Sequence, residues 1–276
     1  MTPAFHPVLP FSLIQGIRLA HALMESKFDV CIPVQHTDKF LRIKEKFNVD
    51  FREGAMGVKC IEDFKIDHSS PKTSIGSIDR PLIFPHSIIN HCRTLWDEKR
   101  GVEVSFAGLI TKKRKRILSE YVKNNFGKEK YIGNVNPINK RLKNKLRKMF
   151  GIGPKSYSIE VGNLEIRSST RGREFPIKAW DERYFNLLSR SKFVICPNGD
   201  YVWSYRFFES ILCGAIPIIE ESCEAYDDFF YYKIEDKYEN LKWDMDKVHS
   251  NYKKCSKRVS VPLDKINNEI DKLMYG

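Results

Sequence analysis

Short apolar runs alternate along the chain with segments whose apolar residues recur at helical spacing. Residues 12–27 (SLIQGIRLAHALMESK) predict a helix and lead into the apolar run 28–34 (FDVCIPV), which predicts a buried strand. Residues 37–47 predict another helix, with Thr37 as its cap. The other elements expected in this half are two strands and a basic helix, at 80–86, 101–110 and 112–126.

The second half repeats this alternation. A strand is predicted at 157–166, an arginine-rich loop at 169–180 and a helix at 181–191. The segment that follows, 191–221, reads SKFVICPNGDYVWSYRFFESILCGAIPIIEE and predicts a strand, a loop, a helix and a second strand. Ser204 is suited to cap its helix, and Gly214 is suited to the exit from that helix.

The alternation of short strands and helices in both halves predicts an α/β fold with two doubly wound domains. We expect an N-terminal domain over residues 1–130 and a C-terminal domain over residues 154–276. A segment rich in Lys, Asn and Gly, residues 131–153, is the expected basic crossover between them.

The composition indicates which class of protein the chain belongs to and in which cellular compartment it is expected. Of the 276 residues, 42% are hydrophobic and 30% are charged, as in an ordinary globular protein. No window reaches the roughly 18 apolar residues of a membrane span, and the N-terminal residues lack the pattern of a secretory signal. The seven cysteines are scattered and most lie in apolar runs. These features predict reduced thiols and a cytoplasmic protein without a membrane span.

The net charge of +12 is concentrated in one segment. Residues 112–148 contain fourteen Lys or Arg and only two acidic residues, Glu120 and Glu129. A basic segment of this kind attracts phosphate groups, so a nucleic-acid-binding protein is one function that the sequence leaves open. Against it, the chain contains no recognised nucleic-acid-binding motif. A solvated helix face followed by a linker also accounts for the charge.

Candidate chemistry lies in the segment 191–221. Its first strand ends at the turn Pro197–Asp200, where open α/β sheets place their ligands. The helix after that turn offers free N–H groups at its start, and Arg206 in its first turn adds a forked cation for phosphate. Glu209, three residues later, could accept hydrogen bonds from a ribose diol. The pattern indicates a nucleotide site, although an ion pair between Arg206 and Glu209 would also explain it.

The same segment resembles the C-terminal signature of exostosin-like glycosyltransferases. The matching residues are Ser191-Lys192-Phe193, Cys196-Pro197, Gly199, Ser204, Arg206, Glu209, Gly214 and Pro217. In the first half, VSFAGLITKKRKRIL resembles the Ser-Phe-x-Gly strand and the arginine-led helix of that family. The resemblance implies a GT-B fold, in which two Rossmann-like domains face a cleft and the C-terminal one holds most of the sugar nucleotide.

The resemblance also implies roles for individual residues. Ser204 and Arg206 would contact the diphosphate of the donor, and Glu209 would contact its ribose. The loop at Asn198, Gly199 and Asp200 would line the donor site. Four further arginines are candidates for the donor phosphates: Arg114, Arg116, Arg171 and Arg173.

Exostosin-like enzymes invert the anomeric carbon, which requires one general base on the acceptor hydroxyl. We expect this base in the first half, and the candidates are Asp67, His68, Asp79 and His86. Asp67 and His68 come first because they resemble an Asp-His pair of the family. No metal or other cofactor is expected, since Arg206 and the helix start could stabilise the leaving diphosphate. The Asp-x-Asp at Asp244–Asp246 is expected to be a charged helix or loop, not a metal site.

The expected partners are a UDP-sugar donor and an oligosaccharide or glycoprotein acceptor, with no nucleic acid. The exostosin-like enzymes of large algal viruses, which glycosylate the capsid protein, make UDP-xylose the leading donor and host cytoplasm the expected location. UDP-glucuronic acid, UDP-N-acetylglucosamine and UDP-galactose remain open. The role would be viral or surface glycan assembly. A catalytically inactive member of the fold, acting as a binding module, is the remaining alternative.

Overall fold

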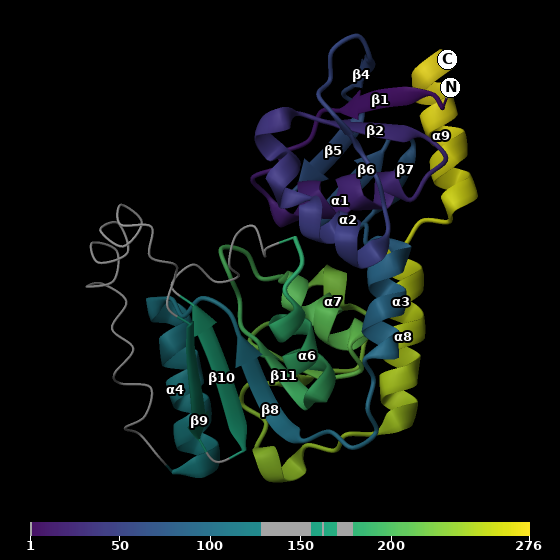
Figure 1. The fold of residues 1–276 in the computed structure, drawn as a ribbon. Helices are drawn as coiled ribbons and strands as arrows, with labels where there is room; N and C mark the ends of the chain where they lie inside the picture. Colours follow the sequence, from purple (N-terminus) through teal and green to yellow (C-terminus); the bar gives the residue numbers. More distant parts are fainter. Residues whose placement is uncertain (1, 128–155, 162, 170–178) are drawn as a thin grey trace, which may run out of the picture. The chain divides into compact units, whose positions relative to one another are not determined.

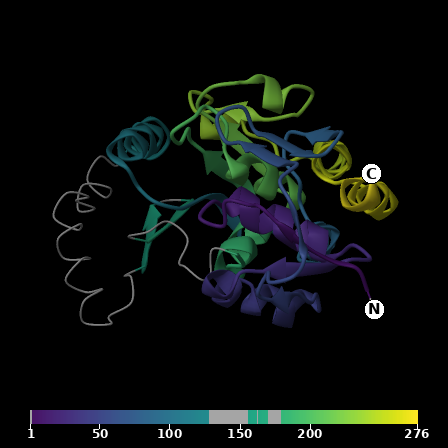
Figure 2. The ribbon, with the colours of Figure 1, turned by 90° about the horizontal axis from the view of Figure 1, so that it is seen from above.

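The computed structural model describes residues 2–127, 156–161, 163–169 and 179–276. They form two compact units, and Figure 1 and Figure 2 show the helices and strands from two directions. Unit 1 contains residues 2–94, 179–180 and 253–276, and unit 2 contains the other described residues. Across these ranges, no helix combines the length and the apolar character that a bilayer span requires.

Unit 1 is built on a parallel sheet whose described strands follow the order β3-β2-β1-β4. The strands are β1 (Ala4–Pro7), β2 (Asp29–Ile32), β3 (Arg52–Glu53) and β4 (Lys59–Ile61). The helical elements between them are α1 (Ile14–Met24), the 3-10 helix η1 (Val34–Lys39) and α2 (Leu41–Phe47). Fully buried side chains from α1 and the strands, such as Ile17 and Phe5, belong to one core.

A second, antiparallel sheet belongs to the same unit. Its strands are β5 (Phe64–Asp67), β6 (Lys72–Ile75) and β7 (Ile78–Arg80). Two helices complete the unit, α3 (His86–Thr94) and α9 (Leu263–Tyr275). Ile266 and Ile270 of α9 lie in the same buried cluster as Ile75 of β6. This apolar contact explains why the last part of the chain belongs with the first.

Unit 2 is built on a larger sheet with the strand order β13-β12-β11-β8-β10-β9. Its strands are β8 (Val102–Ala107), β9 (Ser156–Val161), β10 (Leu164–Ser169), β11 (Ser191–Cys196), β12 (Ile216–Ile219) and β13 (Tyr232–Lys233). Neighbouring strands are parallel except for β9 and β10, which are antiparallel. β8 is therefore an inner strand, with β10 on one side and β11 on the other.

Helices cover both faces of this sheet. They are α4 (Lys112–Phe126), α6 (Glu182–Arg190), α7 (Tyr205–Leu212) and the first part of α8 (Met245–Val259), with the 3-10 helices η2 (Glu224–Tyr226) and η3 (Tyr238–Asn240). Leu118 of α4 shares a buried cluster with Phe106 and Ile195 of the strands. Ile195 and Cys196 are adjacent in β11 and therefore point to opposite faces of the sheet, and the thiol of Cys196 lies 4.0 Å from the hydroxyl of Ser210 in α7. α7 therefore lies on the face opposite α4.

Several predicted elements are confirmed, and others need correction. β2, β8, α1, α4, α6 and the whole series β11, α7, β12 lie where the pattern placed them. The predicted strand at 80–86 is wrong, because β7 ends at Arg80 and α3 already begins at His86. The single strand expected at 157–166 is instead two strands, β9 and β10. Thr37 is not a helix cap but lies inside η1, where its hydroxyl donates to the carbonyl of Val34.

The compact units divide the chain differently from the predicted ranges 1–130 and 154–276. β8 and α4 belong to unit 2, because β8 is hydrogen-bonded between β10 and β11. The chain from residue 253 onward belongs to unit 1. A domain boundary predicted from a polar segment misses both of these assignments, because they depend on strand pairing and core contacts between residues far apart in the sequence. The predicted crossover at 131–153 lies outside the described residues.

Candidate functional site

The loops that follow β8 and β11 lie at the point in the sheet of unit 2 where the strand order reverses. From β8 the next parallel strand is β10, on one side, and the chain then crosses to β11 on the other side. In open α/β sheets, the loops at the carboxyl ends of two such strands diverge and leave room for a ligand. Residues 108–111 and 197–204 form these loops here. Their side chains, and those of the helices that follow, define the candidate site.

Arg206 connects the first turn of α7 to the carboxyl end of β8. Its Nε donates a 2.8 Å hydrogen bond to the carbonyl oxygen of Ala107, and its guanidinium carbon lies 4.7 Å from the ring centroid of Phe106. Gly108 has a φ of +151°, and a Cβ at this position would collide with Nη2 of Arg206. The Ser-Phe-x-Gly pattern is thereby explained, because the glycine makes room for the guanidinium.

Arg114 approaches the same place from the first turn of α4. Thr111 caps that helix, since its hydroxyl accepts a hydrogen bond from the backbone N–H of Arg114. Nε of Arg114 donates to the carbonyl of Asn198 at 3.2 Å, and Nη1 donates to the carbonyl of Leu109 at 3.1 Å. Nη2 lies only 3.0 Å from the position that a Cβ on Gly199 would occupy. The side chain therefore joins the loops after β8 and β11.

The two guanidiniums are close enough to influence each other's charge. Burial first, and the charge of Arg206 second, lower the pKa of Arg114 to about 10, while Asp200 and Glu220 act in the opposite direction. Arg114 still carries its charge at neutral pH. Two neighbouring cations repel, so an anion that accepts hydrogen bonds from both is favoured at this point.

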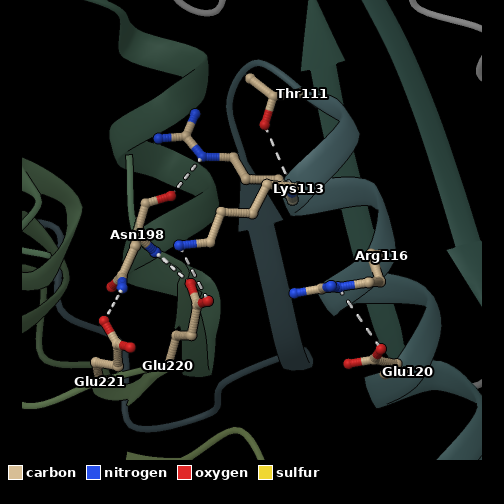
Figure 3. A network of polar contacts seen from close by, with 8 residues as sticks. Thr111, Lys113, Arg116, Glu120, Asn198, Glu220 and Glu221 are labelled. Atoms are coloured by element: carbon tan, nitrogen blue, oxygen red, sulfur yellow. Dashed lines mark hydrogen bonds and ion pairs between the residues drawn. The ribbon is translucent and has the colours of Figure 1, made fainter. Parts of the chain in front are cut away.

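Asn198 organises the polar network beside these arginines (Figure 3). Its side-chain nitrogen donates to Oε2 of Glu221 at 2.7 Å, and its backbone N–H donates to Oε2 of Glu220 at 3.1 Å. Glu220 also pairs with Nζ of Lys113 in α4, at 3.3 Å. Asn198 is 3% exposed, and its Oδ1 has no hydrogen-bond partner among the described residues. The network holds together the loops that follow β8, β11 and β12.

Three members of this network were missed by the sequence analysis: Lys113, Glu220 and Glu221. A local signal for the two acids was present. Glu220 and Glu221 directly follow Ile219, the last residue of β12, so they stand at the same sheet edge as the predicted loop 198–200. No comparable signal distinguishes Lys113 within its run of basic residues.

Ser204 stands at the N-cap position of α7, as predicted, but its side chain makes no capping hydrogen bond. Its backbone N–H donates to the hydroxyl of Tyr226 at 2.7 Å. Tyr226 is held in turn by stacking on Phe207, with 3.8 Å between ring centroids. The Oγ of Ser204 is buried, and the serine side chain interacts with the same tyrosine hydroxyl. A hydroxyl at a helix start that makes no cap is available to a bound anion.

Glu209 is placed differently from a surface carboxylate. It is 0% exposed, and its Oε2 accepts a 2.7 Å hydrogen bond from the hydroxyl of Tyr184 in α6. The alternative reading, a surface ion pair with Arg206, does not fit a fully buried carboxylate. The predicted contact of Glu209 with a ribose remains a prediction.

The remaining predicted donor residues lie at varying positions. Asp200 is exposed, and Gly199 donates its backbone N–H to the carbonyl of Tyr201. The exposed Arg116 lies 3.8 Å from Glu120, one helical turn further along α4, as Figure 3 shows. The structure thus brings Arg114 and Arg206 together and pairs Arg116 elsewhere. Arg171 and Arg173 lie outside the described residues.

The first two base candidates, Asp67 and His68, have distinct environments in unit 1. The carboxylate of Asp67 accepts hydrogen bonds from the hydroxyls of Ser69 and Ser70 and from the backbone N–H of Ser69. These bonds lower the pKa of Asp67 to about 2, which makes it a weak proton acceptor. His68 is half-buried, and its Nδ1 lies 2.6 Å from Oε1 of Gln15 in α1.

The other two candidates are held by structural contacts. Asp79 accepts a hydrogen bond from Ser74 and pairs with Lys72, and both contacts lower its pKa. His86 begins α3, and its Nε2 lies 2.8 Å from the carbonyl oxygen of Val261, to which it can only donate. Nδ1 of His68 has the same kind of contact, and in each neutral ring the lone pair is then on the other nitrogen. Both histidines remain candidates for the base, whereas the lowered pKa values of Asp67 and Asp79 make the two carboxylates weaker proton acceptors.

The Asp-x-Asp pattern has a structural explanation. Oδ1 of Asp244 accepts hydrogen bonds from the backbone N–H groups of Asp246 and Lys247, which caps the start of α8. Among the side chains that the structure describes, no group of three or more His, Cys, Asp or Glu is arranged to hold a metal ion.

Comparisons with known proteins give a family. The family model described as "Exostosin GT47 domain" matches residues 64–240, which is more than half of the chain. A rice (Oryza sativa subsp. japonica) protein named as a probable glucuronosyltransferase is 38% identical over 71 residues. That alignment covers 25% of this chain and 16% of the rice protein.

Solved structures show only distant similarity. Anabaena Alr3699/HepE in complex with UDP-glucose aligns with 98% of this chain and 71% of that protein, at 12% identity and a TM-score of 0.35. The same protein in complex with UDP aligns over the same shares at 14% identity and a TM-score of 0.34. Scores of this size carry no weight in assigning function.

Proposed function

The chain belongs to the exostosin GT47 family, and from this premise we propose that it is an inverting glycosyltransferase. It transfers a sugar from a UDP-sugar to a hydroxyl group of a glycan acceptor. The α/β fold, with a sheet of wholly or mainly parallel strands in each unit, agrees with the GT-B class expected of this family. The matched rice protein is far longer than the aligned segment, so the activity itself is part of the proposal.

One observation carries the donor site. Arg114 and Arg206 reach the carboxyl edge of the unit 2 sheet from two different helices, and the charge of one lowers the pKa of the other. The buried hydroxyl of Ser204 stands at the start of the same α7 helix. Two forked cations and a helix start match the charge and the oxygen geometry of a diphosphate.

The remaining parts of the nucleotide would bind along the same edge of the sheet. Glu209 lies one turn after Arg206 and would accept hydrogen bonds from the ribose hydroxyls, held in orientation by Tyr184. The loop from Asn198 to Asp200 would line the donor site. Oδ1 of Asn198 is buried and has no hydrogen-bond partner within the part of the chain that the structure describes, so it offers one acceptor to a hydroxyl of the donor.

The proposed chemistry is a single displacement. The acceptor oxygen attacks the anomeric carbon from the face opposite UDP, while the bond from that carbon to the diphosphate oxygen breaks. A base accepts the proton of the acceptor hydroxyl, and His68 is the leading candidate. The charge that develops on the diphosphate is stabilised by Arg114 and Arg206, so the proposal requires no metal ion.

Xylose remains the leading donor sugar, because of the resemblance to the algal-virus enzymes. The rice relative is named as a probable glucuronosyltransferase, which makes UDP-glucuronic acid the second choice. The proposed role is assembly of a viral or surface glycan. The choice depends on contacts to the substituents at C5 and C2 of the sugar.

Thermal unfolding with UDP, GDP and a panel of UDP-sugars, each with and without EDTA, tests the proposal. We expect stabilisation by UDP and by one UDP-sugar, unchanged by EDTA. Arg206→Ala should abolish the shift, while Arg116→Ala, which removes an exposed arginine of the same basic helix, should keep it. No shift with any nucleotide would contradict the donor site.

Nucleic-acid binding is the second candidate, and the basic run 112–116 at the start of α4 is the observation in its favour. Two residues of this run are already engaged by the candidate site, Lys113 with Glu220 and Arg114 with Asn198. Titration with single-stranded and double-stranded oligonucleotides over a range of salt would show a steep salt dependence if this candidate is right. A stabilising UDP-sugar that is never turned over with any acceptor would instead support an inactive binding module.

A further inference from the structure

The contact between Gln15 and His68 determines which ring nitrogen of the histidine carries its proton. Nδ1 of His68 lies 2.6 Å from Oε1 of Gln15. An amide oxygen can only accept a hydrogen bond, so Nδ1 must be the donor. In the neutral imidazole, the lone pair is then on Nε2. The contact therefore sets the tautomer that a general base acting through Nε2 requires.

The position of Gln15 links this contact to the sheet edge of unit 1. Gln15 lies in the first turn of α1, the helix that follows the carboxyl end of β1. The residue is 2% exposed, and within the described residues its Nε2 has no hydrogen-bond partner. A buried donor without a partner costs stability, whereas an apolar side chain would not. The amide is thus unfavourable for the core, and its carbonyl contact with His68 gives it a reason to be there.

The backbone of His68 is fixed independently. Asp67, the preceding residue, accepts hydrogen bonds from the backbone N–H of Ser69 and from the hydroxyls of Ser69 and Ser70. These contacts form a tight turn around His68, while Gln15 holds the ring. Both the main chain and the imidazole are held before any substrate arrives, which is what a general base needs.

We infer that Gln15 is the positioning residue of the catalytic base. It holds His68 as the Nδ1–H tautomer, and Nε2 accepts the proton of the acceptor hydroxyl as the new glycosidic bond forms. The carbonyl of Gln15 continues to accept from Nδ1–H in the imidazolium that results. The inference rests on the proposed function, since it assigns the base of that reaction. Asp67 shapes the turn and is not the base.

Histidine-selective ¹⁵N NMR tests the tautomer without any substrate. The spectrum of the parent should show the Nδ1–H tautomer for His68, with the signals assigned by their loss in His68→Gln. Gln15→Leu should give a mixture of tautomers, and Gln15→Glu, which keeps an acceptor oxygen, should preserve the parent form. Gln35→Leu is the matched control, because Gln35 is exposed and is the only other glutamine in the chain. An unchanged His68 tautomer in Gln15→Leu would overturn the inference.

Turnover supplies the second readout. UDP release is measured with UDP-xylose, UDP-glucuronic acid, UDP-N-acetylglucosamine and UDP-galactose in turn, with water as acceptor. Gln15→Leu should lower kcat by about 10- to 100-fold, while the Kd for UDP stays at the parent value. Gln15→Glu should retain more of the rate. Equal kcat in Gln15→Leu and the parent would overturn the inference, and so would full activity in His68→Gln.

The two proposals can fail separately. Failure of the parent to bind UDP would contradict the donor site and the proposed function. Normal UDP binding and turnover combined with an unaffected rate in Gln15→Leu would contradict only the role of Gln15. Weakened UDP binding in Gln15→Leu would also count against it, because a positioning residue for the base should change kcat and not nucleotide affinity.

Discussion

Nε of Arg206 donates a 2.8 Å hydrogen bond to the carbonyl oxygen of Ala107, ninety-nine residues earlier in the chain. The bond ties the first turn of α7 to the carboxyl end of β8. It occupies Nε and leaves the two terminal nitrogens of the guanidinium as further donors. The side chain is thus pre-oriented at the edge where Arg114 also arrives.

Substitution of Arg206 should show whether this fork binds the diphosphate. Arg206→Lys keeps the charge but loses the planar fork, so we expect the Kd for UDP to rise. Removal of a charged hydrogen bond costs about 1.5–3 kcal/mol, which corresponds to a rise of about 10- to 150-fold. Isothermal titration calorimetry with UDP measures it. Arg116→Ala should bind as the parent does, and parent-like binding by Arg206→Ala would disprove the assignment.

Gly108 should be intolerant of any side chain. In Gly108→Ala, the new Cβ would meet Nη2 of Arg206, and the φ of +151° would be strained. We expect weaker UDP binding together with a loss of stability of about 1–3 kcal/mol. Gly127→Ala is the matched control, since Gly127 also has a positive φ (+63°), but no atom of the described residues lies within 4 Å of its Cβ position. Stability is measured by urea unfolding, and equal UDP affinity in the two variants would argue against the steric explanation.

Tyr184 offers a milder way to test Glu209 than removal of the carboxylate. Glu209 is fully buried, so Glu209→Ala would leave a cavity where the carboxylate was and should lower stability as well as UDP binding. Tyr184→Phe removes only the hydroxyl that donates to Oε2 of Glu209. We expect a loss in UDP affinity of about 1 kcal/mol, or about fivefold. Tyr275→Phe, at a 68% exposed position, should have no effect, and an unchanged Tyr184→Phe would remove the support for a ribose contact.

Arg100 is expected to be a main source of stability in unit 2. Its guanidinium donates to the carbonyls of Leu188, Ser191 and Cys213, so it satisfies the carboxyl ends of both α6 and α7. Burial lowers its pKa to about 10, and it therefore stays charged at neutral pH. Arg100→Met keeps an apolar stem and leaves these carbonyls without their donor. We expect a loss of about 3 kcal/mol in the free energy of unfolding.

Tryptophan fluorescence during urea unfolding measures this loss locally, because the guanidinium of Arg100 lies 5.3 Å from the ring of Trp243. Lys99→Met changes the neighbouring exposed side chain and is the control. A midpoint that falls equally in both variants would contradict the role of Arg100.

His21 should make the stability of unit 1 depend on pH. Burial first, and the charge of Arg18 second, hold the pKa of His21 well below its ordinary value. Below about pH 6.5 the unfolded chain binds a proton that the folded chain does not, so stability falls as the pH falls. Between pH 7.5 and 5.5 the parent should lose about 1.4 kcal/mol through this residue. His21→Gln should lack this part of the slope.

Urea unfolding at the two pH values provides the comparison. His249→Gln removes an exposed imidazole and should retain the slope of the parent. A slope in His21→Gln as steep as that of the parent would mean that other groups cause the dependence.

The sequence by itself determined the local elements around the candidate site. The order of β11, α7 and β12 was predictable because apolar runs, a Pro-Asn-Gly-Asp turn and a helix-ending glycine are local signals. Gly214 does end α7 with a φ of +77°, where a Cβ would meet Arg100 and Trp96. The same signals marked Arg206, because the first turn of a helix after a buried strand is identifiable from neighbouring residues alone.

Only the tertiary structure decided which distant residues meet. The pairing of Arg114 with the Asn198 carbonyl, the burial of Glu209 beneath Tyr184 and the contact of Gln15 with His68 each join residues from separate elements. The exchange of β8 and α9 between the expected domains has the same origin. Such contacts depend on strand order and helix packing, which sum many weak interactions over the whole chain. A pattern of neighbouring residues in the sequence therefore cannot predict these contacts.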